Sequence, residues 1–127
     1  MTTNVELDVE AKKLKLKNYR GTLMIDDLAN LNPRVNECAI VNLDTNRGDG
    51  THWVAFWKNK HEKIYFDSFG APPDKRLVKY VKSPILYSTY QIQQFNDENC
   101  GQWCLHVLNE LNLGKDFIDI ILDIING

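Results

Sequence analysis

One cysteine of this chain stands where a helix should begin. Cys100 follows a polar, turn-like stretch at 93–99, and the residues after it place apolar side chains at helical spacing. Asn99 is a residue type that caps helices, so we expect the helix to start close to Cys100. The unpaired N–H groups and the dipole of a helix N-terminus lower the pKa of a thiol. Cys100 is therefore a candidate nucleophile, although a lone cysteine at a helix start is more often a small buried side chain.

A histidine and an aspartate upstream supply the other groups that cysteine hydrolysis requires. The reaction needs an imidazole that shares and donates a proton, and a group that orients the imidazole. His52 begins a predicted strand over 52–57, and Asp67 lies near the end of its predicted hairpin partner over 63–69. Because the ends of paired antiparallel strands meet in space, we expect the two side chains to be neighbours. Asp67 also interrupts an apolar run, where an acidic residue should be paired.

The remaining pattern predicts a sheet with helices around it. Further strands are expected over 38–43 and 85–92. Helices are expected over 7–18, from Ile25 to about Asn32, over 75–82, from Cys100 to about Gly114, and over 115–125. Asp74 is the expected N-cap of the helix over 75–82. Gly21 is expected to mark a turn. Strands in the middle of the chain with helices on both sides predict an α+β fold.

Composition narrows the classes of protein that the chain could be. At 127 residues, with 43% hydrophobic and 25% charged residues, residues 1–127 are expected to form a single soluble domain. No apolar run is long enough to span a bilayer, and no secretory signal is visible, so we expect no membrane association and no secretion. The net charge of −2 gives no general drive toward nucleic acid. Three cysteines without a framework spacing indicate a reducing interior.

Four motifs that occur in a fixed order resemble a known protease family. They are Glu-Cys-Ala-Ile-Val-Asn at 37–42, Gly-x-His-Trp at 50–53, Phe-Asp-x-Phe-Gly at 66–70 and Gln-x-Asn-x-x-x-Cys-Gly at 94–101. Together they resemble adenain, the adenovirus maturation protease, and they are similar to the SUMO-specific proteases that share its fold. The resemblance covers roughly residues 12–112. Each motif alone is weak, whereas four in this order are specific.

The resemblance implies an α+β cysteine peptidase with a central mixed sheet flanked by helices. His52 would be the general acid and base, Cys100 the nucleophile, and Asp67 the group that orients the histidine. Gln94 and the backbone N–H of Cys100 would form the oxyanion hole, with Gln93 held in reserve because the two family branches place this glutamine in different register. The resemblance implies neither a cofactor nor a metal.

The expected function is that of a cysteine endopeptidase which processes capsid and other structural proteins during virion maturation. The match suggests an adenovirus-like virus, a virophage or a related DNA transposon, with the protein acting as a monomer in the host cytoplasm or virus factory and in the virion. Family members favour glycine-containing cleavage sites. Adenain is stimulated by DNA and by a disulfide-linked viral peptide, but residues 80–99 contain no cysteine. Any activating peptide or DNA is therefore expected to bind noncovalently.

Other functions fit parts of the pattern. A protease of ubiquitin-like or SUMO-like modifiers and an acyltransferase would reuse the same His-Asp-Cys set, and a non-catalytic binding module would not need it. The basic residues Lys75, Arg76, Lys79 and Lys82 offer phosphate contacts, but a solvated helix face explains them more simply. Zinc binding by Cys100, Cys104 and His106 is disfavoured, because His106 points about 160° away from Cys104 on a helix and no fourth ligand stands nearby.

Overall fold

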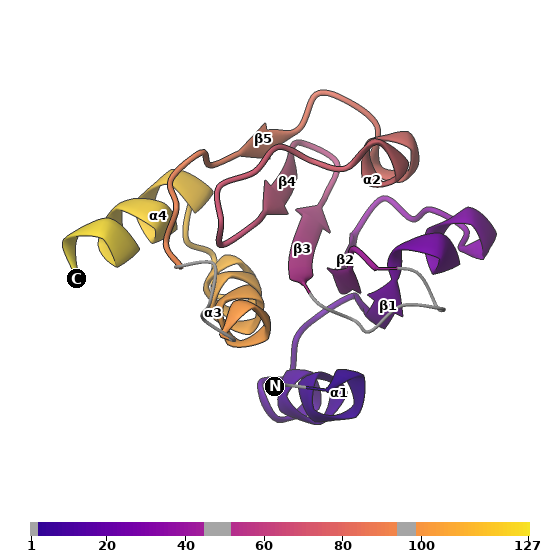
Figure 1. Cartoon of the computed structure of the whole chain (residues 1–127), viewed down its shortest axis with the longest axis horizontal. Helices are drawn as coiled ribbons and strands as arrows, with labels where there is room; N and C mark the ends of the chain where they lie inside the picture. The colour runs from indigo at the N-terminus through magenta and orange to yellow at the C-terminus, as the bar shows by residue number, and fades with distance from the viewer. Residues whose placement is uncertain (1–2, 45–51, 94–98) are drawn as a thin grey trace.

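A five-stranded mixed sheet forms the centre of the computed structural model, which describes residues 3–44, 52–93 and 99–127 (Figure 1). The strands lie across the sheet in chain order: β1 (Tyr19–Met24), β2 (Glu37–Asn42), β3 (Trp53–Lys58), β4 (Lys63–Phe66) and β5 (Leu86–Tyr87). β2, β3 and β4 are antiparallel to one another, while β1 and β5 run parallel to their neighbours at the two edges. The central mixed sheet that the sequence predicts is therefore present.

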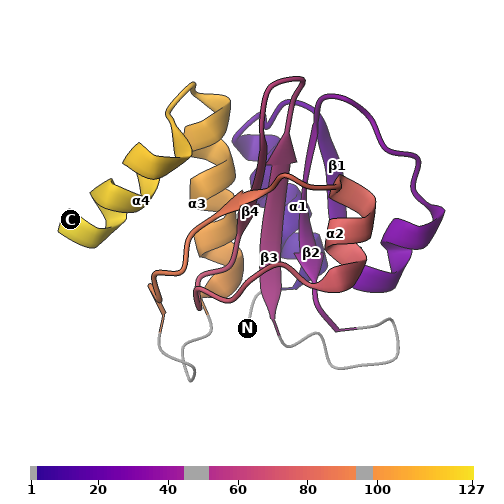
Figure 2. The same ribbon diagram turned by 90° about the horizontal axis from the view of Figure 1, so that it is seen from above.

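Helices cover both faces of the sheet (Figure 2). One face of the sheet is covered by the helices α1 (Asn4–Lys13), α3 (Cys100–Asn112) and α4 (Phe117–Asn126). The other face is covered by the 3-10 helix η1 (Ile25–Asn30) and the helix α2 (Lys75–Val81). Successive side chains of a strand point to opposite faces. Ile40 accordingly packs with α3, and Val41 packs with η1 and α2. The resulting burial on both faces explains why β2 reads as a continuous apolar run.

A glycine lets the first helix approach the helix that carries Cys100. A Cβ atom at Gly101 would lie 3.0 Å from Cδ2 of Leu7 and 3.5 Å from Cδ1 of Trp53. The contact with Leu7 would force that side chain to move, whereas the contact with Trp53 would be an ordinary van der Waals contact. Gly101 thus allows α1 to pack directly against the first turn of α3.

A buried carboxylate joins the sheet to α2. Glu37 at the start of β2 accepts hydrogen bonds from Arg20 at 2.7 Å, from Lys58 at 3.0 Å, from the Tyr80 hydroxyl at 2.8 Å and from the Arg34 N–H at 2.8 Å. Burial by itself would raise the pKa of Glu37, but these hydrogen bonds outweigh it and lower the pKa. The network connects β1, β2, β3 and α2, so we assign Glu37 a structural role.

Three predicted elements differ from the structure. The helix predicted over 7–18 spans Asn4–Lys13 and ends where Lys15 and Asn18 adopt positive φ. The turn predicted at Gly21 is wrong: Gly21 lies inside β1, with φ +131° next to a register shift. The strand predicted over 85–92 is only Leu86–Tyr87, because the chain then leaves β4 and the N–H groups of 92 and 93 bond to the Ser68 carbonyl.

The last helix buries only one side of its apolar surface. Its buried residues are Phe117, Ile120 and Ile121, and its exposed apolar residues are Ile118, Leu122 and Ile125. Among the described residues, no helix is long and apolar enough to cross a membrane.

We predict that Glu37→Gln lowers the free energy of unfolding by about 3–5 kcal/mol, because the substitution leaves the buried charges of Arg20 and Lys58 without their partner. The matched control is Glu10→Gln, which removes an exposed ion pair with Lys13 and should change stability by less than about 1 kcal/mol. Urea denaturation measures both. Equal effects of the two substitutions would contradict the structural role of Glu37.

Candidate active site

The helix α3 begins at Cys100, as the sequence predicts. The Cys100 side chain is buried against the end of β3, where the backbone N–H of Trp53 donates to its Sγ at 3.5 Å. The first N–H groups of a helix have no partners within the helix, and the helix dipole favours negative charge there. The thiol therefore lies where its anion is stabilised by backbone donors.

His52 and Asp67 are brought into contact by the strand pairing. His52 directly precedes β3 and Asp67 directly follows β4, so the antiparallel register puts both at the same end of the sheet. Nε2 of His52 lies 2.8 Å from Oδ1 of Asp67, and the carboxylate is almost completely buried. The same Oδ1 accepts the backbone N–H of Phe69 at 2.8 Å. The two donors hold the carboxylate in one orientation toward the imidazole.

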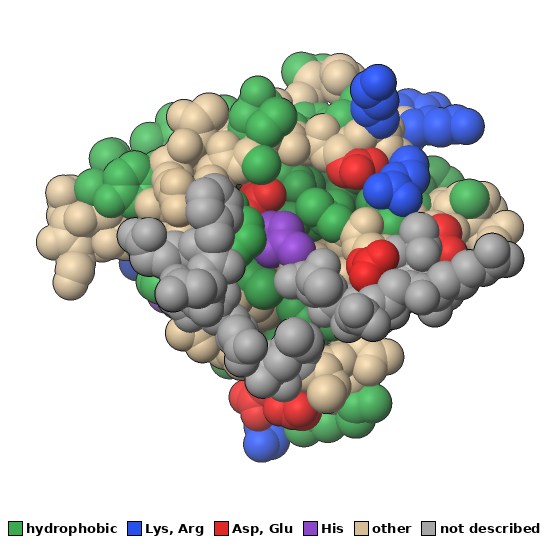
Figure 3. Space-filling view, viewed as in Figure 1, with side chains coloured by type: hydrophobic (Ala, Val, Ile, Leu, Met, Phe, Trp, Pro, Cys, Tyr) green, Lys and Arg blue, Asp and Glu red, His purple; other side chains and the backbone are tan. Residues whose placement is uncertain are grey.

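The ring of Phe69 stacks on the imidazole. The two ring centroids are 4.4 Å apart and the planes differ by 6°. The stack limits rotation of the His52 ring and covers one of its faces. Phe69 belongs to the Phe-Asp-x-Phe-Gly motif, but residue type alone does not distinguish a stacking partner of the histidine from a core phenylalanine. On the face shown in Figure 3, a histidine side chain reaches the surface among hydrophobic side chains, while lysine and arginine side chains gather over α2.

The second nitrogen of the imidazole is available to the thiol. Nδ1 of His52 is buried and makes no hydrogen bond of ordinary geometry with the residues that the structure describes. The interaction of His52 with Cys100 nevertheless contributes to the pKa values of both side chains. Since Nε2 is hydrogen-bonded to Asp67, Nδ1 is the nitrogen that can accept a proton from the Cys100 thiol or return it.

The electrostatic interactions among His52, Asp67 and Cys100 favour a Cys100 thiolate and a His52 imidazolium. Burial, the largest influence on His52, opposes its charge, but Asp67 and Cys100 outweigh burial and raise the pKa of His52 to about 9. Burial also opposes a thiolate at Cys100, yet His52 and the N–H groups of Trp53 and Gly101 lower the pKa of Cys100. Each partner thus stabilises the charged form of the other.

The other two cysteines have the opposite environment. Burial raises the pKa of Cys38 to about 12, and it raises the pKa of Cys104 well above its ordinary value. Their thiols donate to backbone carbonyls, Cys38 to Lys17 and Cys104 to Trp53, each at 3.5 Å. Both lie in the apolar core, as the sequence analysis predicts. Cys100 is the one thiol whose anion is stabilised.

The glutamine predicted for the oxyanion hole, Gln94, lies outside the described residues, as does Gly50 of the histidine motif. Its neighbour Gln93 is buried, and its Oε1 accepts a short hydrogen bond from the Ser68 hydroxyl. Ser68 directly follows Asp67, so this bond ties the segment that precedes α3 to the end of β4. No group of three or more metal-binding side chains occurs in the described part of the chain, which includes Cys100, Cys104 and His106.

Comparison with solved structures identifies the fold. Two crystal structures of the ASFV pS273R protease superpose on this chain, one as the selenomethionine protein with a TM-score of 0.70 and 14% identity and one with a TM-score of 0.62 and 16% identity. The fold is that of the ASFV pS273R protease. The alignments cover 95% and 94% of this chain but 61% and 60% of the protease, so this chain spans about three fifths of its length. The predicted α+β fold is thereby confirmed. The sequence matches no protein-family model and no curated protein.

We predict that His52 stays protonated in the folded protein up to a midpoint near pH 9. A pKa raised above the unfolded value stabilises the fold fully below about pH 6.5, and this contribution is lost as the pH rises through 9. NMR titration of the imidazole resonances measures the midpoint. Asp67→Asn should lower this midpoint, because Cys100 alone then offsets the burial that opposes the charge of His52. A midpoint near 6.5 in the unmodified protein would contradict the assignment.

Proposed function

We propose that this chain is a cysteine endopeptidase, with Cys100 as nucleophile, His52 as general acid and base, and Asp67 as the residue that orients the histidine. One observation carries the proposal: the thiol with the lowered pKa and the imidazole with the raised pKa interact at the N-terminus of a helix. Reactive cysteines of hydrolases have such surroundings. The fold shared with the ASFV pS273R protease supports the same conclusion.

The arrangement leads to a two-step reaction. The Cys100 thiolate forms a bond to the carbonyl carbon of the substrate, and the carbonyl oxygen becomes an oxyanion. As the C–N bond breaks, the His52 imidazolium gives its proton to the leaving amine, and a thioester remains. Neutral His52 then takes a proton from water, whose oxygen attacks the thioester, and breaking the C–S bond restores the thiolate and the imidazolium.

In this proposal the oxyanion is stabilised by the backbone N–H of Cys100 and by the side chain of Gln94. The choice of Gln94 over Gln93 rests on the resemblance to adenain, and Gln93 is the alternative: the Ser68 hydroxyl engages its buried Oε1, whereas an oxyanion donor uses the amide N–H groups.

The biological setting is proposed from the resemblance to adenain. The substrates would be capsid and other structural proteins of an adenovirus-like virus, virophage or related transposon, cleaved by a monomer in the host cytoplasm or virus factory and in the virion. Any activating peptide or DNA would bind noncovalently. The burial and raised pKa values of Cys38 and Cys104 support this, since a disulfide needs a thiolate that a partner can reach.

We predict that Cys100→Ala abolishes cleavage of an internally quenched peptide with a central Gly-Gly, while Cys104→Ala retains turnover with some loss of stability. Purified proteins in reductant are compared by rate, and circular dichroism checks that each is folded. Cleavage of a SUMO fusion but not of the peptide would favour a modifier protease, and thioester exchange with an acyl donor would favour an acyltransferase. Full activity of Cys100→Ala would overturn the assignment.

We predict that Gln94→Ala lowers kcat by roughly 100- to 1000-fold, the usual effect of removing one oxyanion donor. KM should change less, because the oxyanion forms only near the transition state. Gln93→Ala serves as the neighbouring control and should mainly lower stability through the lost bond to Ser68. If Gln93→Ala is the variant with the large kcat defect, the two roles are reversed.

A further inference from the structure

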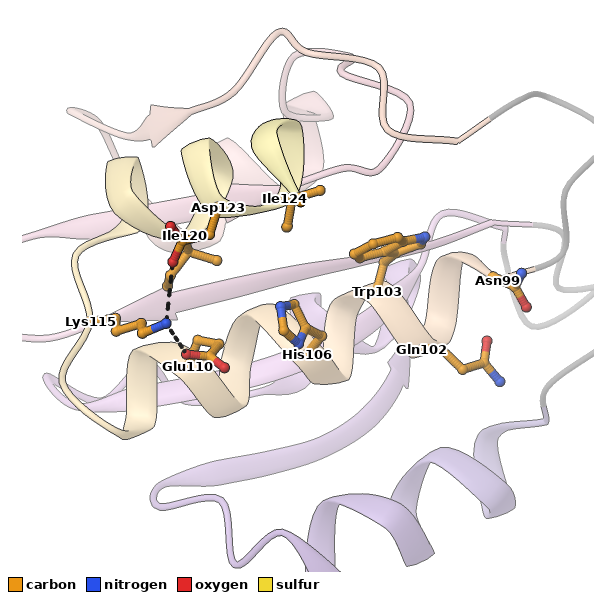
Figure 4. Close-up of a pocket in the computed structure, with 10 residues that line it drawn as sticks. Asn99, Gln102, Trp103, His106, Glu110, Lys115, Ile120, Asp123 and Ile124 are labelled. Carbon is orange, nitrogen blue, oxygen red and sulfur yellow. Dashed lines mark hydrogen bonds and ion pairs between the residues drawn. The ribbon is translucent and has the colours of Figure 1, made fainter.

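A groove runs between α3 and α4 (Figure 4). It has a volume of ≈ 640 Å³. Three apolar side chains form its wall: Trp103 from α3 and Ile120 and Ile124 from α4. The proposed hydrolysis makes no use of this groove.

One end of the groove lies next to the nucleophile. Asn99, which lines it, directly precedes Cys100, and Trp103 is on the first turn of α3. From Trp103 to Glu110 the helix rises about 10 Å, at 1.5 Å per residue. An extended peptide covers this length with about three residues. A polypeptide held at Cys100 can therefore enter the groove without a long connection.

The two ends of the groove differ in chemistry. Near Cys100, the half-buried Trp103 is fixed edge-to-face by His106, with ring centroids 5.9 Å apart. At the far end, Lys115 bridges Glu110 at 3.1 Å and Asp123 at 3.3 Å. Two carboxylates against one ammonium leave a residual negative charge. The groove thus offers an apolar contact first and an anionic contact about three residues further on.

We propose that this groove binds the substrate polypeptide on one side of the cleaved bond, and that it selects a large apolar side chain followed by lysine or arginine. The inference rests on the proposed peptidase function. One end of the groove is lined by Asn99, the residue before the proposed nucleophile, which favours the substrate as its occupant, and the residual negative charge complements a basic residue.

The test compares a short internally quenched peptide with longer ones. The short probe is a hexapeptide with a central Gly-Gly, and two long probes carry Ala-Leu-Ala-Ala-Lys added at one end or at the other. Each long probe has a counterpart in which glutamate replaces the lysine. The variant Ile124→Ala removes part of the groove wall, and its matched control Ile125→Ala removes the same side chain from an exposed position outside the groove. Asp123→Lys, with Asp119→Lys as control on the same helix, tests the charge.

One of the two long probes should have a KM roughly 10-fold lower than the short probe, the gain expected from burying one leucine side chain. Ile124→Ala should remove most of this gain at unchanged kcat, and Ile125→Ala should keep it. Asp123→Lys should weaken the preference for the long probe with lysine over its glutamate counterpart, and Asp119→Lys should not. The short probe should respond to none of these substitutions.

Equal KM values for the short probe and both long probes would overturn the inference, and so would equal effects of Ile124→Ala and Ile125→Ala. If no probe is cleaved, the proposed function fails. Binding of the long peptides to the groove is then tested independently of cleavage, by fluorescence anisotropy of the labelled peptides with Cys100→Ala. Saturable binding that Ile124→Ala weakens would support the groove as a peptide site, and absence of binding would reject it. Association of two copies through the groove, seen as a dimer in sedimentation that Ile124→Ala abolishes, would also reject the substrate as its occupant.

Discussion

The hydrogen bond between His52 and Asp67 determines the charge of the whole candidate site. Burial alone would keep the imidazole neutral, and Cys100 would then lack the opposite charge that lowers its pKa. The bond forms because the β3–β4 pairing places the start of one strand beside the end of the other, and because the Phe69 N–H fixes the same carboxylate oxygen. The reactivity of a thiol at the start of α3 thus depends on a register set within the sheet.

Two buried carboxylates in this protein show why hydrogen-bond partners, and not burial, distinguish a structural group from a candidate catalytic one. Glu37 is saturated by two basic side chains, a hydroxyl and a backbone N–H, and none of these donors lies beside a thiol whose pKa is lowered. Asp67 holds a histidine whose other ring nitrogen is left for Cys100. The cysteines divide in the same way: Cys38 and Cys104 donate to carbonyls, while Cys100 accepts from an N–H.

The sequence predicts the start of α3 and the contact of His52 with Asp67 better than it predicts the edges of the sheet. The start of α3 at Cys100 and the meeting of His52 with Asp67 follow from local capping and antiparallel geometry, which neighbouring residues encode. The bulge at Gly21 and the early end of β5 depend on which strand lies alongside, and that is long-range information. The stacking of Phe69 on His52 likewise arises only once β3 and β4 are paired. The groove between α3 and α4 depends on how two helices pack, which their individual patterns do not specify.

The most direct test of the thiolate–imidazolium pair is the ultraviolet absorbance of the thiolate during a pH titration of the folded protein, taken as the difference from Cys100→Ser. The structure predicts a step for Cys100 clearly below its ordinary value of 9.0, and His52→Ala should move this step upward. Cys38 and Cys104 should contribute no step in that range, because their pKa values are raised. A Cys100 step at or above pH 9 that His52→Ala leaves unchanged would contradict the ion pair on which the proposed chemistry depends.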